Sequence, residues 1–125
     1  MRYFEHSEFD QKGLVGSGFK MKQSFLVHLD ELRRRCDFPF VITSGYRTPE
    51  YNNQVSSSGL TGAHTTGKAA DISVSHENAY KLLQIAFNMS VFTGIGINQK
   101  GNARFIHLDT CDKSDGLLRP AVWSY

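Results

Sequence analysis

The sequence predicts an α+β domain in which helices flank a small antiparallel sheet. Two segments carry apolar residues at helical spacing, and several short runs are rich in β-branched and aromatic residues. The last of these runs lie close enough along the chain to form a hairpin, which favours antiparallel pairing. At 125 residues the chain has the length of one domain with its own hydrophobic core. We therefore expect residues 1–125 to form a single domain.

The first half of the chain is predicted to contain two helices around one strand. Residues 19–38 have one apolar stripe typical of a helix, formed by Met21, Phe25, Leu29 and Leu32. His28 lies off the centre of this stripe, and we interpret it as a surface or boundary residue.

The strand is expected in "FPFVITSG", residues 38–45, where Gly45 ends a run of β-branched and aromatic residues. Thr48 is then a suitable N-cap, and Pro49 fits the first position of a short helix that ends in a serine-rich loop.

The second half is predicted to contain four strands and one helix. "AADISVS" at 69–75 has the pattern of a strand, and residues 76–89 have that of a helix. "FTGIGIN" and "RFIHLDT" are predicted strands joined by the turn-like "QKGNA", residues 99–103. The tail "RPAVWSY" is predicted to form a last short strand.

Composition argues against several classes of partner. The net charge is +2, and the one basic run, residues 33–35, suits the C-terminal end of a helix. We therefore expect no nucleic-acid partner, although mild positive charge suits an anionic polymer such as a bacterial cell wall. No apolar run approaches the roughly 20 residues of a membrane span, so membrane insertion is not expected. Cys36 and Cys111 lack the spacing of a disulfide framework or a cysteine zinc site, so we expect reduced thiols.

The segment "SGLTGAHTTGKAADISV" places His64 and Asp71 on either side of Gly67. On one continuous helix these two residues would stand about 10.5 Å apart along the axis. Zinc holds its ligand atoms within roughly 2.0–2.2 Å, so a helix would not bring them to one ion. A loop that returns at Gly67 into the strand solves this problem, because glycine accepts the backbone conformations of a tight turn.

His107 is the best third ligand for such a site. Side chains alternate along a strand, so His107 and Asp109 share one face of "RFIHLDT" while Ile106 and Leu108 face the core. Each polar residue alone has an ordinary structural explanation, such as a hydrogen-bonded core histidine or a capping aspartate. Together, imidazole ligands and a carboxylate indicate a metal site and favour zinc, Zn²⁺.

The ordered motifs "SGYRTPEYNNQV", "GAHTTGKAADI", "GIGI" and "FIHLDT" resemble the zinc D-Ala-D-Ala carboxypeptidase-like peptidases, in the small form found among bacteriophage endolysins and prophage proteins. The resemblance covers most of the chain. It implies the compact α+β fold of the hedgehog and DD-peptidase type. It also implies that His64, Asp71 and His107 bind zinc and that Arg47 holds a substrate carbonyl or carboxylate.

This sequence departs from the resembled family where an acid is expected three residues before the last ligand. Arg104 occupies that position and cannot act as a base. Asp109 is the nearest acidic substitute, and two roles stay open for it: general base, or partner of a ligand histidine. Ala63 stands where a serine usually precedes the first ligand. Cys111 is either an extra soft ligand or, as we favour, an ordinary buried thiol.

The resemblance implies zinc-dependent hydrolysis of peptide bonds in bacterial peptidoglycan, with its stem peptide as substrate. The N-terminus has no apolar signal-peptide region, so we expect synthesis in the cytoplasm and action on the wall after release or delivery, as in phage lysis. A non-catalytic, zinc-stabilised binding domain of the same fold is the alternative. The bond that is cut and the oligomeric state are not determined by the sequence.

Overall fold

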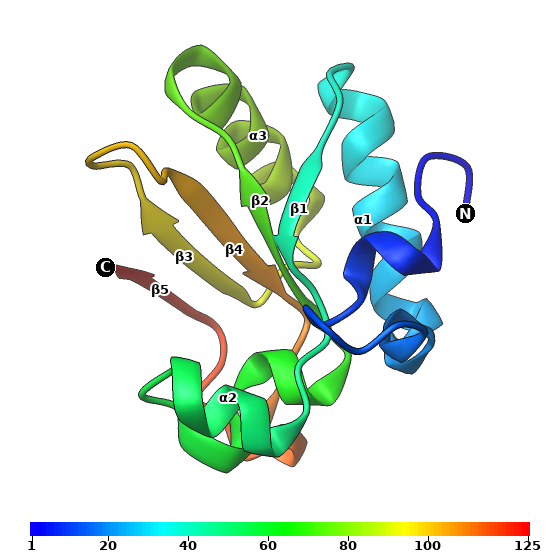
Figure 1. Cartoon of the computed structure of the whole chain (residues 1–125). Coiled ribbons are helices and arrows are strands. Elements are labelled where there is room, and N and C mark those ends of the chain that lie inside the picture. Colours follow the sequence, from blue (N-terminus) through cyan, green and yellow to red (C-terminus); the bar gives the residue numbers. More distant parts are fainter.

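The computed structural model describes all of residues 1–125, with five strands in one sheet ordered β1-β2-β4-β3-β5 (Figure 1). The strands are β1 Val41–Ser44, β2 Ala69–Ser73, β3 Gly94–Asn98, β4 Phe105–Asp109 and β5 Ala121–Ser124. The α-helices are α1 Gln23–Cys36, α2 Pro49–Val55 and α3 His76–Met89. Short 3₁₀ helices are η1 His6–Phe9, η2 Ser17–Lys20, η3 Gly59–Thr61, η4 Ala63–Thr66 and η5 Lys113–Asp115. The predicted α+β class is confirmed.

The sheet is antiparallel at three of its pairings and parallel at the fourth. β1 with β2, β2 with β4, and β3 with β4 run antiparallel. β5 instead pairs with β3 in the parallel direction, so the predicted antiparallel sheet has one parallel pairing at its edge. The physical reason is the connection after β4: residues 110–120 carry the chain past β3, so that β5 lies beyond it at the edge of the sheet (Figure 1).

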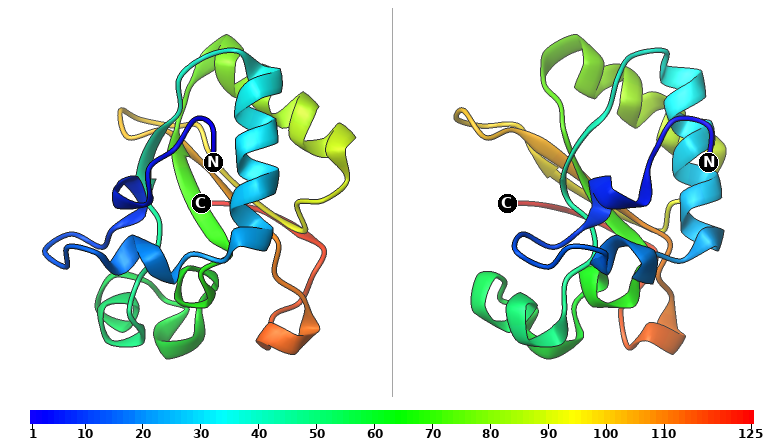
Figure 2. Two further views of the ribbon diagram at one scale, coloured as in Figure 1. Left: turned by 90° about the vertical axis from the view of Figure 1, so that its right-hand side faces the viewer. Right: turned by 45° about the vertical axis from the view of Figure 1, so that its right-hand side comes forward.

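The hydrophobic core lies between one face of the sheet and the helices α1 and α3, which lie on the same side (Figure 2). Helix α1 buries the predicted stripe, including Phe25 and Leu29, and α3 buries Leu82. Ile106 and Leu108 of β4 face these helices. Each fully buried large apolar side chain contributes about 1.5–3 kcal/mol. This face therefore supplies most of the stability of the fold.

The opposite face of the sheet carries polar side chains. Strand register aligns Asp71 of β2 with His107 of β4, which in turn faces Gly96 of β3. Asp109 lies on the same face because side chains alternate along β4. None of the helices is long and apolar enough to cross a membrane. The sheet thus separates an apolar core from a polar surface. In the view of Figure 1, α2 and η4 lie below this sheet.

The start of α2 agrees with the sequence prediction. Thr48 is the N-cap, its side-chain oxygen accepts a hydrogen bond from the Tyr51 backbone N–H at 3.2 Å, and Pro49 begins the helix. Replacing Thr48 by Ala is expected to lower the free energy of unfolding by about 1 kcal/mol, because one helix N–H loses its partner. Denaturant titration checks this value. Thr48→Ser keeps the acceptor and serves as the control; equal stability of the Ala and Ser variants would contradict the cap.

Candidate metal centre

His64 reaches the polar face of the sheet from η4. The chain turns after this short helix at Gly67, whose φ of 78° lies in the left-handed region. A Cβ at this position would clash with the Lys20 carbonyl oxygen, so glycine is required for space as well as for conformation. The predicted return of the chain at Gly67 is confirmed, with one 3₁₀ helix in place of an irregular loop. The His64 carbonyl also accepts the Arg47 backbone N–H at 3.1 Å, which fixes η4 beside β1.

The structure brings His64, Asp71 and His107 together. All three are buried, and one potential ligand atom from each lies within 4.8 Å of the other two. The Oδ1 atom of Asp71 is 3.3 Å from Nε2 of His64 and 3.0 Å from Nδ1 of His107. Residues from η4, β2 and β4 therefore meet at one point.

The outer nitrogen of each imidazole has an acceptor of its own. Nδ1 of His64 lies 2.8 Å from the Gly45 carbonyl oxygen, and Nε2 of His107 lies 2.7 Å from Oδ2 of Asp109. These acceptors can take the ring protons in hydrogen bonds when the inner nitrogens bind a cation. The inner nitrogens then present lone pairs toward Oδ1 of Asp71. Three lone pairs that converge in a buried site suit a cation between them.

The donor set fits a zinc ion. Two imidazoles and one carboxylate are ligands that zinc accepts, and three protein ligands leave a fourth position open for water or substrate. Around a tetrahedral ion with bonds near 2.05 Å, ligand atoms stand roughly 3.3 Å apart. The separations of 3.0 and 3.3 Å from Oδ1 of Asp71 are close to this value. The role of the three residues as zinc ligands stays a prediction, now with suitable geometry.

The charge states at this point suit a cation. Burial alone would raise the pKa of Asp71, but the charge of His64 and the hydrogen bond from His107 outweigh burial and lower it. Asp71 is therefore ionised at neutral pH. Burial lowers the pKa of His107, yet hydrogen bonds to Asp109 and Asp71 raise it overall. A proton and a metal ion thus compete for the same imidazole, as is usual for metal-binding histidines.

Arg47 lies beside the triad, where the sequence predicted a substrate-binding residue. Its Nε donates to Oγ of Ser44 at 3.0 Å and its Nη1 to Oδ1 of Asn52 at 3.0 Å. Nη2 is 3.8 Å from Oδ2 of Asp71, and Arg47 is one of the residues that line the pocket above the triad. The guanidinium is therefore held on one side and available to a ligand on the other, which suits recognition of a carbonyl or carboxylate.

Asn52 is a supporting residue that sequence reasoning missed. It is fully buried in α2, where it accepts from Arg47 and donates to Oγ of Ser58 at 2.9 Å and to the Gly59 carbonyl. It thereby ties Arg47 to the serine-rich loop. The sequence held one signal for this role: Asn52 lies one helical turn after Thr48, so its side chain is on the face of α2 that points back toward β1.

Asp109 is fully buried and is absent from the lining of the pocket above the triad. Its Oδ2 contacts His107, and both of its oxygens accept from Arg119, at 3.0 and 2.8 Å. The backbone N–H of Cys111 donates to Oδ1 as well. Of the two predicted roles, this geometry favours a partner of the ligand histidine, because no free oxygen of Asp109 faces a substrate.

The other departures lie away from the metal centre or play no part in it. Arg104 lines a separate surface pocket together with Phe38 and His76, and it is absent from the lining of the pocket above the triad. Cys111 is buried outside the triad, with its Sγ 3.5 Å from Oγ1 of Thr66. Burial raises the pKa of the Cys111 thiol to about 11. It is an ordinary buried thiol, as the sequence favoured.

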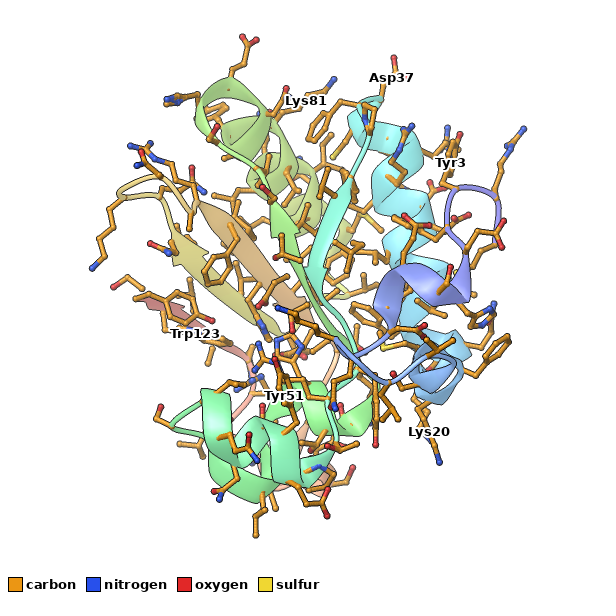
Figure 3. All side chains as sticks on the ribbon, viewed as in Figure 1. Tyr3, Lys20, Asp37, Tyr51, Lys81 and Trp123 are labelled. Carbon is orange, nitrogen blue, oxygen red and sulfur yellow. The ribbon has the colours of Figure 1, made fainter.

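A pocket of about 520 Å³ opens above the triad. Its lining combines Arg47 and the serine-rich stretch 56–58 with the aromatic residues Phe105, Trp123 and Tyr125. Trp123 lies beside β5, above α2 (Figure 3). The triad thus forms the floor of an open pocket that has one polar and one aromatic wall.

An α+β domain with a buried His-Asp-His triad beneath an open pocket has the fold and the ligand set of a domain that could hold a metal ion. The chain matches the family model described as Peptidase M15 over residues 2–109 and belongs to that family. The resemblance to the zinc D-Ala-D-Ala carboxypeptidase-like peptidases is therefore confirmed, and the chain is assigned to the zinc-dependent peptidases. Comparison with proteins of curated function found no match.

Proposed function

We propose that the protein hydrolyses peptide bonds in the stem peptides of bacterial peptidoglycan, as a D,D-carboxypeptidase or as an endopeptidase. One observation carries the proposal: the buried triad lies at the floor of a pocket in which Arg47 offers a free edge of its guanidinium. A carbonyl next to a scissile bond, or a terminal carboxylate, suits such a planar donor. Stem peptides offer both groups, and their small side chains suit a pocket of this size.

Each residue of the site would have its own role in the reaction. A bound zinc ion would polarise the scissile carbonyl and lower the pKa of water at the open position. His64, Asp71 and His107 would hold the ion, with their outer atoms fixed by hydrogen bonds. Arg47 would orient the substrate oxygen, because Ser44 and Asn52 already hold its guanidinium in place.

The pocket walls and the net charge support a wall peptide over other peptides. Ser56, Ser57 and Ser58 present hydroxyl and backbone groups opposite Trp123 and Tyr125. A substrate between these walls would contact polar groups on one side and rings on the other. The net charge of +2 favours approach to an anionic polymer. We extend the proposal to delivery: the protein would act on the wall after release from the cell in which it is made.

The second candidate function is a zinc-stabilised domain that binds wall peptides without cutting them. Asp71 is the only acidic residue that lines the pocket, so no carboxylate besides a predicted ligand is present to accept a proton from water. This observation favours the alternative, and the experiment below separates the two functions.

The zinc-loaded protein is to be incubated with purified peptidoglycan and with soluble stem peptides, and the products identified by mass spectrometry. The proposal expects new termini: free D-alanine for a carboxypeptidase, or a split cross-link for an endopeptidase. His64→Ala serves as the inactive control. One equivalent of bound zinc without any new terminus in either substrate would reject hydrolysis and leave the binding domain.

A further inference from the structure

We propose that the C-terminal segment 119–123, through Arg119 and Trp123, holds Asp109 and His107 in the position that metal binding requires. These two residues lie outside the segment 2–109 that matches the family. Neither residue is among the predicted ligands. The proposal assigns both as positioning residues of the metal centre, which act through Asp109 and the ring of His107.

The first contact is a two-pronged ion pair. Nε of Arg119 donates to Oδ1 of Asp109 at 3.0 Å, and Nη2 donates to Oδ2 at 2.8 Å. Asp109 is fully buried, and its other partners are His107 and one backbone N–H. Arg119 thus supplies a full positive charge to a carboxylate that has no access to water.

The second contact is a tilted packing of the Trp123 indole against the His107 ring, beside a glycine. The parallel register of β3 and β5 pairs Gly96 with Trp123, and a Cβ at Gly96 would clash with the indole ring. The indole lies 5.1 Å from the ring of His107, and the Arg119 guanidinium lies over it at 4.9 Å. Trp123 therefore packs against both the imidazole and the arginine that orients its carboxylate partner.

A second glycine explains how the carboxylate fits. Gly94 faces Asp109 across the β3–β4 pair, and a Cβ at Gly94 would clash with the carboxylate atoms of Asp109. The carboxylate therefore lies flat on β3, with one oxygen toward His107. Arg119, Asp109 and His107 are thus linked by consecutive hydrogen bonds, which connect the C-terminal segment to the predicted metal ligand.

These linked hydrogen bonds matter for metal binding because they determine which nitrogen of His107 has a free lone pair. Oδ2 of Asp109 accepts a hydrogen bond from the Nε2–H group of His107, which leaves Nδ1 free to bind a cation. Partners of this kind typically change metal affinity 10–100-fold. Without Arg119, neither oxygen of the Asp109 carboxylate would have its charged donor, and the carboxylate would turn away from His107. His107 would then lose its orientation although no ligand had changed.

The test measures zinc affinity of the full chain by competition with a chromophoric chelator. Arg119→Met and Asp109→Asn are each expected to weaken zinc binding about 10–100-fold. The double variant is expected to bind zinc no more weakly than the worse single variant, because both changes break the same series of hydrogen bonds. Arg35→Met removes an exposed arginine that pairs with Glu31 on α1, and it is the matched control with unchanged affinity.

The ring of His107 provides a second readout. Its ¹⁵N chemical shifts in the zinc-free protein are expected to report a proton on Nε2 in the wild type and a mixture of tautomers in Arg119→Met. If that variant fails to fold, as judged by circular dichroism, Arg119→Gln is measured in its place. Wild-type zinc affinity in the folded variant, or additive losses in the double variant, would overturn the proposal. Because zinc binding is the readout, a failure to cleave peptidoglycan would leave this result unaffected.

Discussion

Replacing His107 by Ala is expected to abolish stoichiometric zinc binding and to lower peptidase activity by roughly three orders of magnitude. The ring would supply one of three ligand atoms, and its Nδ1 lies 3.0 Å from the Asp71 oxygen at the centre of the triad. Removing the ring leaves two protein ligands, fewer than the three of a catalytic zinc site. The metal contributes several kcal/mol to the transition state, and about 1.4 kcal/mol corresponds to each factor of ten.

The measurement is zinc content after dialysis, together with hydrolysis of a stem peptide. His28→Ala is the control, since His28 is a half-buried residue of α1 far from the triad in the chain and absent from the pocket lining. We expect this variant to keep one zinc ion and full activity. Full zinc occupancy in His107→Ala would refute the predicted set of ligands.

Replacing Arg47 by Met is expected to lower kcat/KM about 100- to 1,000-fold while zinc content stays at one equivalent. The magnitude is that of removing one preorganised donor from a developing oxyanion. Arg47→Lys is expected to restore only part of the activity, because an ammonium group lacks the planar fork. The free energy of unfolding should fall by about 1–3 kcal/mol in Arg47→Met, since the buried Asn52 oxygen loses its donor.

Arg104→Met is the matched control for this prediction. It removes the same charge from a side chain that lines a different pocket and donates to the Gly101 carbonyl. We expect its kcat/KM to match that of the wild type. An equal loss of activity in Arg104→Met and Arg47→Met would contradict the prediction. It would show that the net positive charge of the protein governs turnover, and not the position of Arg47 beside the triad.

Local rules were sufficient to predict the helices and most strands, and they singled out His64, Asp71 and His107 as candidate ligands, which the family resemblance then supported. The stripe of α1 follows from helical period, and the cap of α2 follows from Thr48 and Pro49. Alternation along β4 placed His107 opposite Ile106 and Leu108. These features depend on neighbours within a few residues, which a sequence shows directly.

Long-range pairings were beyond such rules. The parallel contact of β5 with β3 joins segments separated by a connection that has no periodic signal. Since Trp123 comes to lie over Gly96 only through that pairing, its contact with His107 had no local signature. The ion pair of Arg119 with Asp109 depends on the same pairing. For this reason the sequence left the role of Asp109 open between two alternatives.

The glycines of β3 have a consequence for how this scaffold accommodates different substrates. Beneath the pocket, Gly94 and Gly96 have no side chain because Asp109 and Trp123 occupy that space. Any larger residue at either position would displace part of the metal centre. New substrate preferences must therefore arise in the walls, from the serine-rich stretch 56–58 or from Leu117 and Tyr125. β3 carries no predicted ligand, yet it is closed to diversification at these two positions, and a library that aims to alter selectivity should leave them unchanged.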